Sequence, residues 1–169
     1  GINTTIDAFK EWYAIMAGSP EAIDKVTNAL QGGFQNMISG LSDALDKGKK
    51  EFSSKIDEIE QELGFKIPKE VKTEWKLEAR TEDLKGDIEQ TLQFLMDPNI
   101  SDESAKYFVD NLYSKISAEV ARNPKLAAAA NTINSLLSEY LNADTVEAKD
   151  AALAKVMFAV ENLRATAED

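Results

Sequence analysis

Apolar side chains recur along almost the whole chain at the three- and four-residue spacing of an amphipathic helix. The clearest pattern lies between Ile23 and Leu63, where spacings of three, four and four repeat with a period of eleven residues. Eleven residues make three turns of about 3.67 residues each, close to the geometry of a straight helix. The pattern therefore predicts a long second helix over residues 20–63 with its apolar stripe on one face.

Glycines interrupt this predicted helix. Gly32 and Gly33 are adjacent, and Gly48 stands where the repeat would place an apolar residue. Each glycine in a helix costs about 1 kcal/mol relative to alanine. Gly32 and Gly33 are therefore the candidate hinge, whereas burial of the stripe would favour a continuous helix. The sequence leaves open whether residues 20–63 form one helix or two.

Helix start and stop signals divide the rest of the chain. Proline after a capping residue marks several boundaries, and a third helix is predicted from Pro68 to Met96. Asp144, with Glu147 three residues later, is the predicted cap of the last helix. The chain is thus predicted to be an all-α bundle of about six amphipathic helices in a single domain, residues 1–169.

One interior boundary offers a subdivision of this domain. Proline after aspartate at Asp97 and Pro98 disfavours helix on both sides of the bond. This boundary would separate a long helical hairpin, residues 1–97, from a three-helix subdomain, residues 98–169.

Composition restricts the chemistry that the chain can perform. It contains no cysteine and no histidine, which removes disulfides, thiolate nucleophiles, structural zinc and the commonest general base. The acids Asp57, Glu58, Glu60 and Glu62 are expected to form a solvated helix face rather than a metal site. We therefore expect a non-enzymatic protein with no catalytic residue, cofactor or metal. The net charge of −11 also disfavours nucleic acid as a partner.

Aromatic residues and methionines on the apolar stripes are candidates for binding an apolar ligand. Such side chains are large and adaptable, although they also serve as ordinary core residues. The candidate ligand-binding residues are Trp12, Tyr13, Phe34, Met37 and Phe108, together with Leu112 on the same stripe as Phe108.

Two segments resemble repeats of known families. The eleven-residue period over Ile23 to Leu63 is similar to the repeat of exchangeable apolipoproteins and apolipophorin-type bundles, which implies a soluble bundle that opens onto lipid. Lysines do not border this stripe regularly, and prolines do not separate its repeats. Phe9 and Trp12, followed by residues 19–23, are similar to the tryptophan half of a repeat in helical effectors secreted by oomycetes, with no tyrosine half downstream. Neither resemblance assigns the chain to a family.

Two functions follow as predictions. The first is a helical bundle that binds an apolar small molecule or lipid, and the alternative is a protein–protein interaction module, such as a secreted effector or surface antigen with a helical hairpin. No apolar run reaches the roughly 18 residues of a transmembrane segment. The glycosylation tripeptides at Asn3 and Asn99 favour a secreted or extracellular location. We expect a soluble monomer or homodimer.

Overall fold

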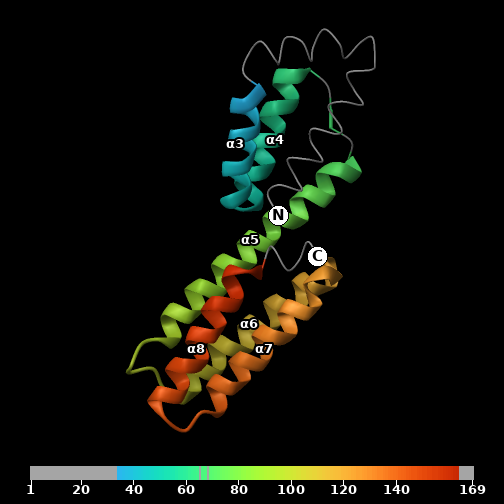
Figure 1. Cartoon of the computed structure of the whole chain (residues 1–169). Coiled ribbons are helices and arrows are strands. Elements are labelled where there is room, and N and C mark those ends of the chain that lie inside the picture. Colours follow the sequence, from blue (N-terminus) through green and yellow to red (C-terminus); the bar gives the residue numbers. More distant parts are fainter. Residues whose placement is uncertain (1–33, 65, 68, 164–169) are drawn as a thin grey trace. The chain divides into compact units, whose positions relative to one another are not determined.

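The computed structural model describes residues 34–64, 66–67 and 69–163. These residues form six α-helices and one 3-10 turn, and none of them belongs to a β-strand (Figure 1). The predicted all-α bundle of about six helices is confirmed. The elements are α3 (Phe34–Asp46), α4 (Lys49–Leu63), α5 (Lys69–Leu95), α6 (Asp102–Arg122), η1 (Pro124–Leu126), α7 (Ala127–Asn142) and α8 (Val146–Glu161).

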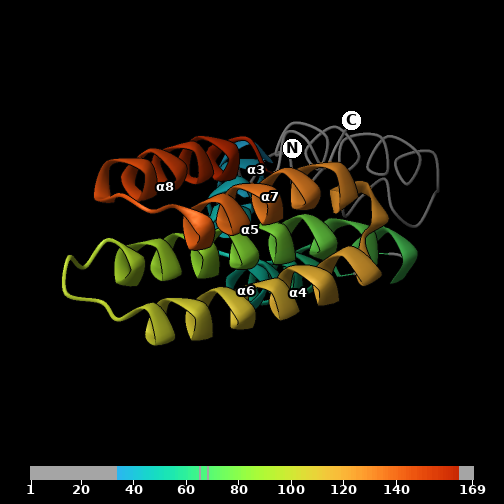
Figure 2. The same cartoon turned by 90° about the horizontal axis from the view of Figure 1, so that it is seen from below.

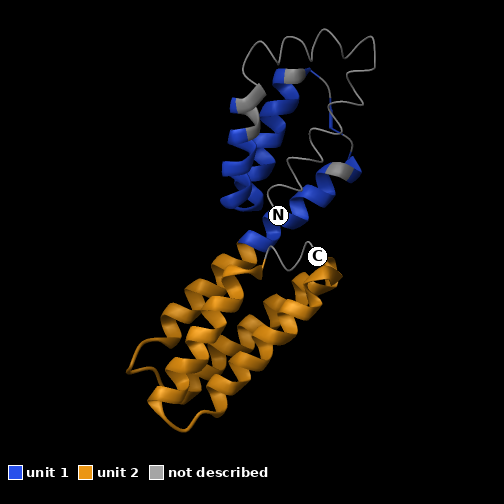
Figure 3. Ribbon diagram, in the orientation of Figure 1, with its two compact units in different colours: residues 1–82 blue, residues 83–169 orange. Residues whose placement is uncertain are grey.

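The chain divides into two compact units, unit 1 (residues 1–82) and unit 2 (residues 83–169) (Figure 3). The division falls inside α5, between Glu82 and Asp83, so this helix contributes to both units. The segment at Asp97 and Pro98 is instead the turn from α5 to α6 within unit 2. Both of these helices contribute buried side chains to one core, which keeps the two sides of the turn in the same unit.

In unit 1, α3 and α4 pack against each other and are separated by a break at Gly48. Gly48 has φ of 104°, a backbone conformation that residues with a Cβ rarely adopt. Its N–H donates to the Leu45 carbonyl (3.2 Å), and its own carbonyl accepts from Phe52 N–H (3.0 Å). The expectation of one long helix is therefore corrected, because residues 34–63 form two helices. The break lies at the glycine that interrupts the apolar repeat.

Unit 1 buries a carboxylate beside its apolar side chains. Glu60 is 3% exposed, whereas Asp57, Glu58 and Glu62 are exposed. The expected solvated face is therefore corrected at Glu60, which follows buried Ile59 and lies one turn beyond buried Ile56. The buried apolar residues in the described part of unit 1 are Leu41, Ala44, Leu45, Phe52, Ile56, Ile59, Ile67, Trp75 and Ala79.

Glu60 fixes the connection from α4 to α5. One of its carboxylate oxygens accepts from Ile67 N–H (2.7 Å) and from Lys72 Nζ (3.1 Å). Its backbone carbonyl accepts from the N–H of Gly64, the left-handed residue that ends α4 (2.8 Å). One residue thus satisfies polar groups on both sides of the turn.

Unit 2 is a helical bundle made of the second half of α5 together with α6, α7 and α8 (Figure 1 and Figure 2). The apolar stripes predicted for these helices supply its core, which is one continuous cluster. Its buried members are Leu84, Ile88, Leu92, Leu95, Ala105, Val109, Leu112, Ile116, Leu126, Ala130, Ile133, Leu137, Tyr140, Ala152, Leu153, Val156, Val160 and Leu163.

Local signals set the helix boundaries in unit 2. The Ser101 hydroxyl caps α6 by accepting from Ser104 N–H (3.0 Å). Pro124 opens η1, which leads directly into α7. The cap of α8 is Thr145 rather than Asp144, because the Thr145 hydroxyl accepts from Ala148 N–H (3.1 Å). The predicted cap was one residue too early.

Candidate functional site

Apolar side chains are exposed to solvent at the turn from α5 to α6. We call this surface the aromatic tip and define it as Phe94, Met96, Tyr107 and Phe108. Phe94 and Phe108 stack with ring centroids 5.0 Å apart and an interplanar angle of 19°. Tyr107 meets Phe108 edge-on at 5.8 Å. Phe94 is 47% exposed and Tyr107 is 65% exposed. The rings therefore hold one another in place while much of their surface faces solvent.

A groove of about 420 Å³ adjoins the aromatic tip. Both stacked rings line it, together with the half-buried side chain of Ile100 and five polar residues. The complete lining is Gln93, Phe94, Asp97, Asn99, Ile100, Ser101, Ser104 and Phe108. A lining that combines apolar and polar side chains is typical of surfaces that accept an apolar side chain from a partner.

Hydrogen bonds hold the turn below the groove. Asp97 Oδ1 accepts from Asn99 N–H (2.9 Å), and the Asp97 carbonyl accepts from Ile100 N–H (3.1 Å). The Ser101 cap then fixes the first turn of α6. The groove is therefore preformed, which reduces the ordering cost of binding.

The charge around the aromatic tip is negative. Residues 93–110 contain four acids and one base, Lys106. Lys106 Nζ lies 2.8 Å from Asp110 Oδ2, and this hydrogen bond, with the charge of Asp110, raises the pKa of Lys106. The single cation is thus paired, which leaves the charges of Asp97, Asp102 and Glu103 to dominate the local potential.

The structure places two of the predicted ligand-binding side chains. Phe108 lines the groove at the aromatic tip, whereas Leu112, one turn further along α6, is buried in the unit 2 core. Phe34 and Met37 lie in α3, but their side chains are not among those described. Trp12, Tyr13, Gly32 and Gly33 fall outside the described residues. Binding at these positions stays a prediction.

Phe94 and Met96 are members of the tip that the sequence did not single out as binding residues. Phe94 immediately precedes the buried Leu95, so helical geometry turns it about 100° away from the α5 stripe. That offset is a usable signal for an exposed aromatic side chain. The stacking on Phe108 depends on tertiary structure, and no local pattern predicts it.

Two further findings concern membrane spans and metal ligands. No helix within the described residues is long and apolar enough to cross a membrane. Over the same part of the chain, no group of three or more carboxylates is arranged to hold a metal ion.

Comparisons with known proteins add no functional assignment. No protein-family model matches this chain, and neither a curated protein nor a solved structure matches it.

Proposed function

We propose that this chain is a non-enzymatic protein-interaction module whose aromatic tip binds an apolar segment of a partner protein flanked by basic residues. The observation that carries the proposal is the exposed Phe94–Phe108 stack beside the groove. Exposed aromatic clusters of this kind are enriched at protein interfaces because burying them on binding releases water from a large apolar area.

Rigidity supports a role in recognition. A side chain that is already fixed loses little conformational freedom when a partner covers it. Phe94 and Phe108 fix each other by stacking, and Tyr107 supports Phe108 from the edge. The tip therefore presents a prearranged surface to a partner.

Charge complementarity selects the partner. The unpaired acids near the tip would attract lysine and arginine and would repel acidic segments and anionic membranes. The volume of the groove suits one or two apolar side chains rather than a whole domain. A short amphipathic segment with a basic flank matches both features.

Selection from a random peptide library displayed on phage, with the intact chain as bait, tests the proposal. We expect enriched peptides to combine aromatic or aliphatic residues with lysine or arginine. Phe94→Ser should weaken the binding of an enriched peptide by about tenfold or more, because Phe94 forms half of the ring stack. Phe158→Ser is the matched control, since Phe158 is 71% exposed and lies on α8, away from the groove.

Two outcomes would overturn the proposal. One is a selection that enriches no common sequence, or enriches peptides that bind Phe94→Ser as tightly as the unaltered chain. The other is Phe94-dependent binding to neutral phosphatidylcholine vesicles without peptide binding, which would favour the lipid function.

A further inference from the structure

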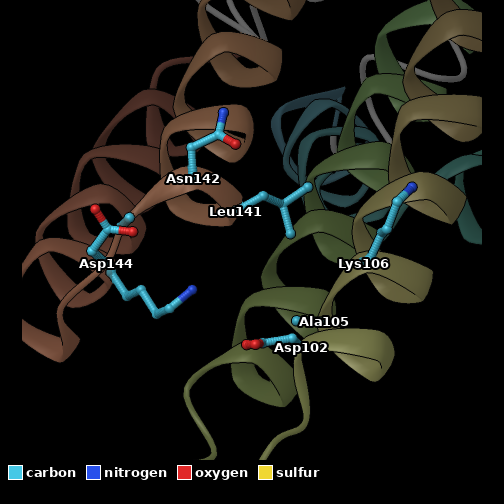
Figure 4. A pocket seen from close by; sticks show the side chains of 8 residues that line it. Asp102, Ala105, Lys106, Leu141, Asn142 and Asp144 are labelled. Carbon is cyan, nitrogen blue, oxygen red and sulfur yellow. The ribbon is translucent and has the colours of Figure 1, made fainter.

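A second and larger cavity is lined by other residues at the start of α6. Its volume is about 710 Å³, within the range of about 300–1,000 Å³ that is typical of small-molecule sites. In Figure 4, Asp102 and Lys106 on α6 stand across the cavity from Asn142 and Asp144, at the end of α7 and the connection to α8, with Leu141 between the two walls. The complete lining is Asp102, Ala105, Lys106, Leu141, Asn142, Ala143, Asp144 and Lys149.

A fixed ammonium group supplies positive charge to this cavity. Lys149 Nζ donates to the Tyr140 carbonyl (3.3 Å) and lies 4.8 Å from the centroid of the Tyr140 ring. These two contacts hold a lysine that is only half-buried. An ammonium group has three donors, so hydrogen-bonding capacity remains for an acceptor on a ligand.

Carboxylates supply negative charge from both walls. Asp102 belongs to α6 and Asp144 to the α7–α8 connection, and within the described part of the chain neither makes an ion pair with a lysine or arginine. The pKa of Tyr140 is raised, mainly by burial of its side chain and next by the negative charge of Asp102. The acid on α6 and the ring that carries the fixed lysine are thus electrostatic neighbours.

Small and apolar side chains line the cavity between the charged groups. Ala105 is buried, and Ala143 and Leu141 are half-buried. The alanines leave volume that longer side chains would fill, and Leu141 offers an apolar surface. A ligand in this cavity would meet a cation, carboxylates and an aliphatic contact together.

We infer that this cavity binds a small peptide-like zwitterion, with the ligand carboxylate on Lys149, its ammonium group on Asp102 or Asp144, and an apolar body against Leu141. A simple anion would use Lys149 but would be repelled by the two aspartates. A simple cation would be attracted by the two aspartates but repelled by Lys149. A molecule that carries both charges matches the opposite signs that line the cavity. This inference does not depend on the aromatic tip.

Nuclear magnetic resonance titration of the ¹⁵N-labelled full chain tests the inference. The probe is the tripeptide glycyl-leucyl-glycine, with acetate, methylamine and free leucine added separately for comparison. We expect the tripeptide to shift amide signals of residues 141–144 and Lys149 in a saturable manner, and acetate or methylamine alone to produce no saturable shift. Saturable shifts with leucine but not with the tripeptide would identify a free amino acid as the preferred zwitterion.

Two pairs of variants separate the site from general charge effects. Lys149→Gln should weaken tripeptide binding by about tenfold or more, because it removes a charge-assisted hydrogen bond. Lys155→Gln, also on α8 but paired with Glu139 outside the cavity, should change it less than about twofold. Asp102→Asn should weaken binding, whereas Glu103→Gln, at the neighbouring exposed acid, should not. Phe94→Ser should leave tripeptide binding intact, which separates this test from that of the aromatic tip.

The inference would be overturned if neither the tripeptide nor leucine gave saturable shifts in the millimolar range. It would also be overturned if acetate reproduced the shifts of the tripeptide, since that would indicate a simple anion site. Equal affinities of the tripeptide for the Lys149→Gln and Lys155→Gln variants would also overturn the inference. The spectra of the free variants show whether each one is folded, and Asp102→Asn provides an independent test if Lys149→Gln is not.

Discussion

In unit 2, four helices contribute one apolar cluster, whereas unit 1 buries a carboxylate among its apolar side chains. Both polar residues that are buried in the described part of the chain, Glu60 and Thr81, belong to unit 1. The Thr81 hydroxyl donates to the Leu77 carbonyl within α5, so it needs no partner from another element. Glu60 instead joins separate segments of unit 1, because it accepts hydrogen bonds from Ile67 and Lys72.

The backbone shows the same contrast. The two residues with positive φ in the described ranges, Gly48 and Gly64, are both glycines of unit 1. Connections in unit 2 use side-chain caps at Ser101 and Thr145, and a proline at Pro124. The connections of unit 2 thus use side-chain caps and a proline, whereas two turns in the described part of unit 1 use glycines with positive φ.

The largest effect that we predict comes from the apolar core of unit 2. Leu137 is fully buried in α7, and Leu137→Ala should reduce the free energy of unfolding by about 4 kcal/mol, because it leaves a cavity in a closely packed cluster. Urea unfolding followed by far-ultraviolet circular dichroism measures the loss. The neighbouring Leu136 is only half-buried, so Leu136→Ala should cost clearly less. Equal losses would show that the cluster does not determine stability here.

Removal of the buried carboxylate tests unit 1. Glu60→Ala should destabilise unit 1 by about 3 kcal/mol, because the Ile67 N–H would be left buried without an acceptor and Lys72 would lose its ion-pair partner. Fluorescence of the buried Trp75, in a background in which Trp12 is replaced by phenylalanine, reports unfolding of this unit.

The control for this prediction is Glu62→Ala, which changes an exposed acid of the same helix and should have little effect. Hydrogen exchange in α6, α7 and α8 should remain slow in Glu60→Ala. If Glu60→Ala and Glu62→Ala reduced the stability of unit 1 equally, Glu60 would not have the structural role that its hydrogen bonds indicate.

The contrast between the units also explains what the sequence could predict. In unit 2 each boundary has a local signal, such as Ser101 or Pro124, and the helical stripes meet in one core. The burial of Glu60 had no such signal, because the N–H that it satisfies lies seven residues further along the chain. The glycine cost at Gly48 was visible, but its left-handed backbone depends on the packing of α3 on α4.

The candidate site was predictable to a similar extent. Phe108 was identified as an aromatic residue on an apolar stripe, and it does line the groove. Leu112 was identified from the same stripe, yet it faces the core. Spacing alone places both residues on one face, and only the packing of the neighbouring helices decides where that face ends. The pairing of Phe94 with Phe108 required two helices to be brought together by the turn between them.

Alanine substitution of two glycines, one in each unit, should change the stability in opposite directions. Gly48→Ala should destabilise unit 1 by about 2 kcal/mol, because a Cβ is strained at φ of 104°. Gly86, in the part of α5 that belongs to unit 2, has open space where a Cβ would lie, so Gly86→Ala should stabilise the chain by up to about 1 kcal/mol. Urea midpoints of the two variants measure both changes. A stabilising Gly48→Ala would show that the helix continues through the break.

The smallest effect that we predict is a loss of stability at alkaline pH that originates in unit 2. Burial, followed by the charges of Asp102 and Asp150, raises the pKa of Tyr140 above its usual value near 10. Since the folded state holds this proton more tightly, its contribution to stability is complete below the unfolded pKa and is lost as the pH rises toward the folded pKa. Urea midpoints measured from pH 9 to pH 11 should therefore fall less steeply in Tyr140→Phe than in the unaltered chain. An unchanged slope would contradict this assignment. Since Tyr140 lies in α7, a difference between the two slopes would belong to unit 2 and would sharpen the contrast between the two units.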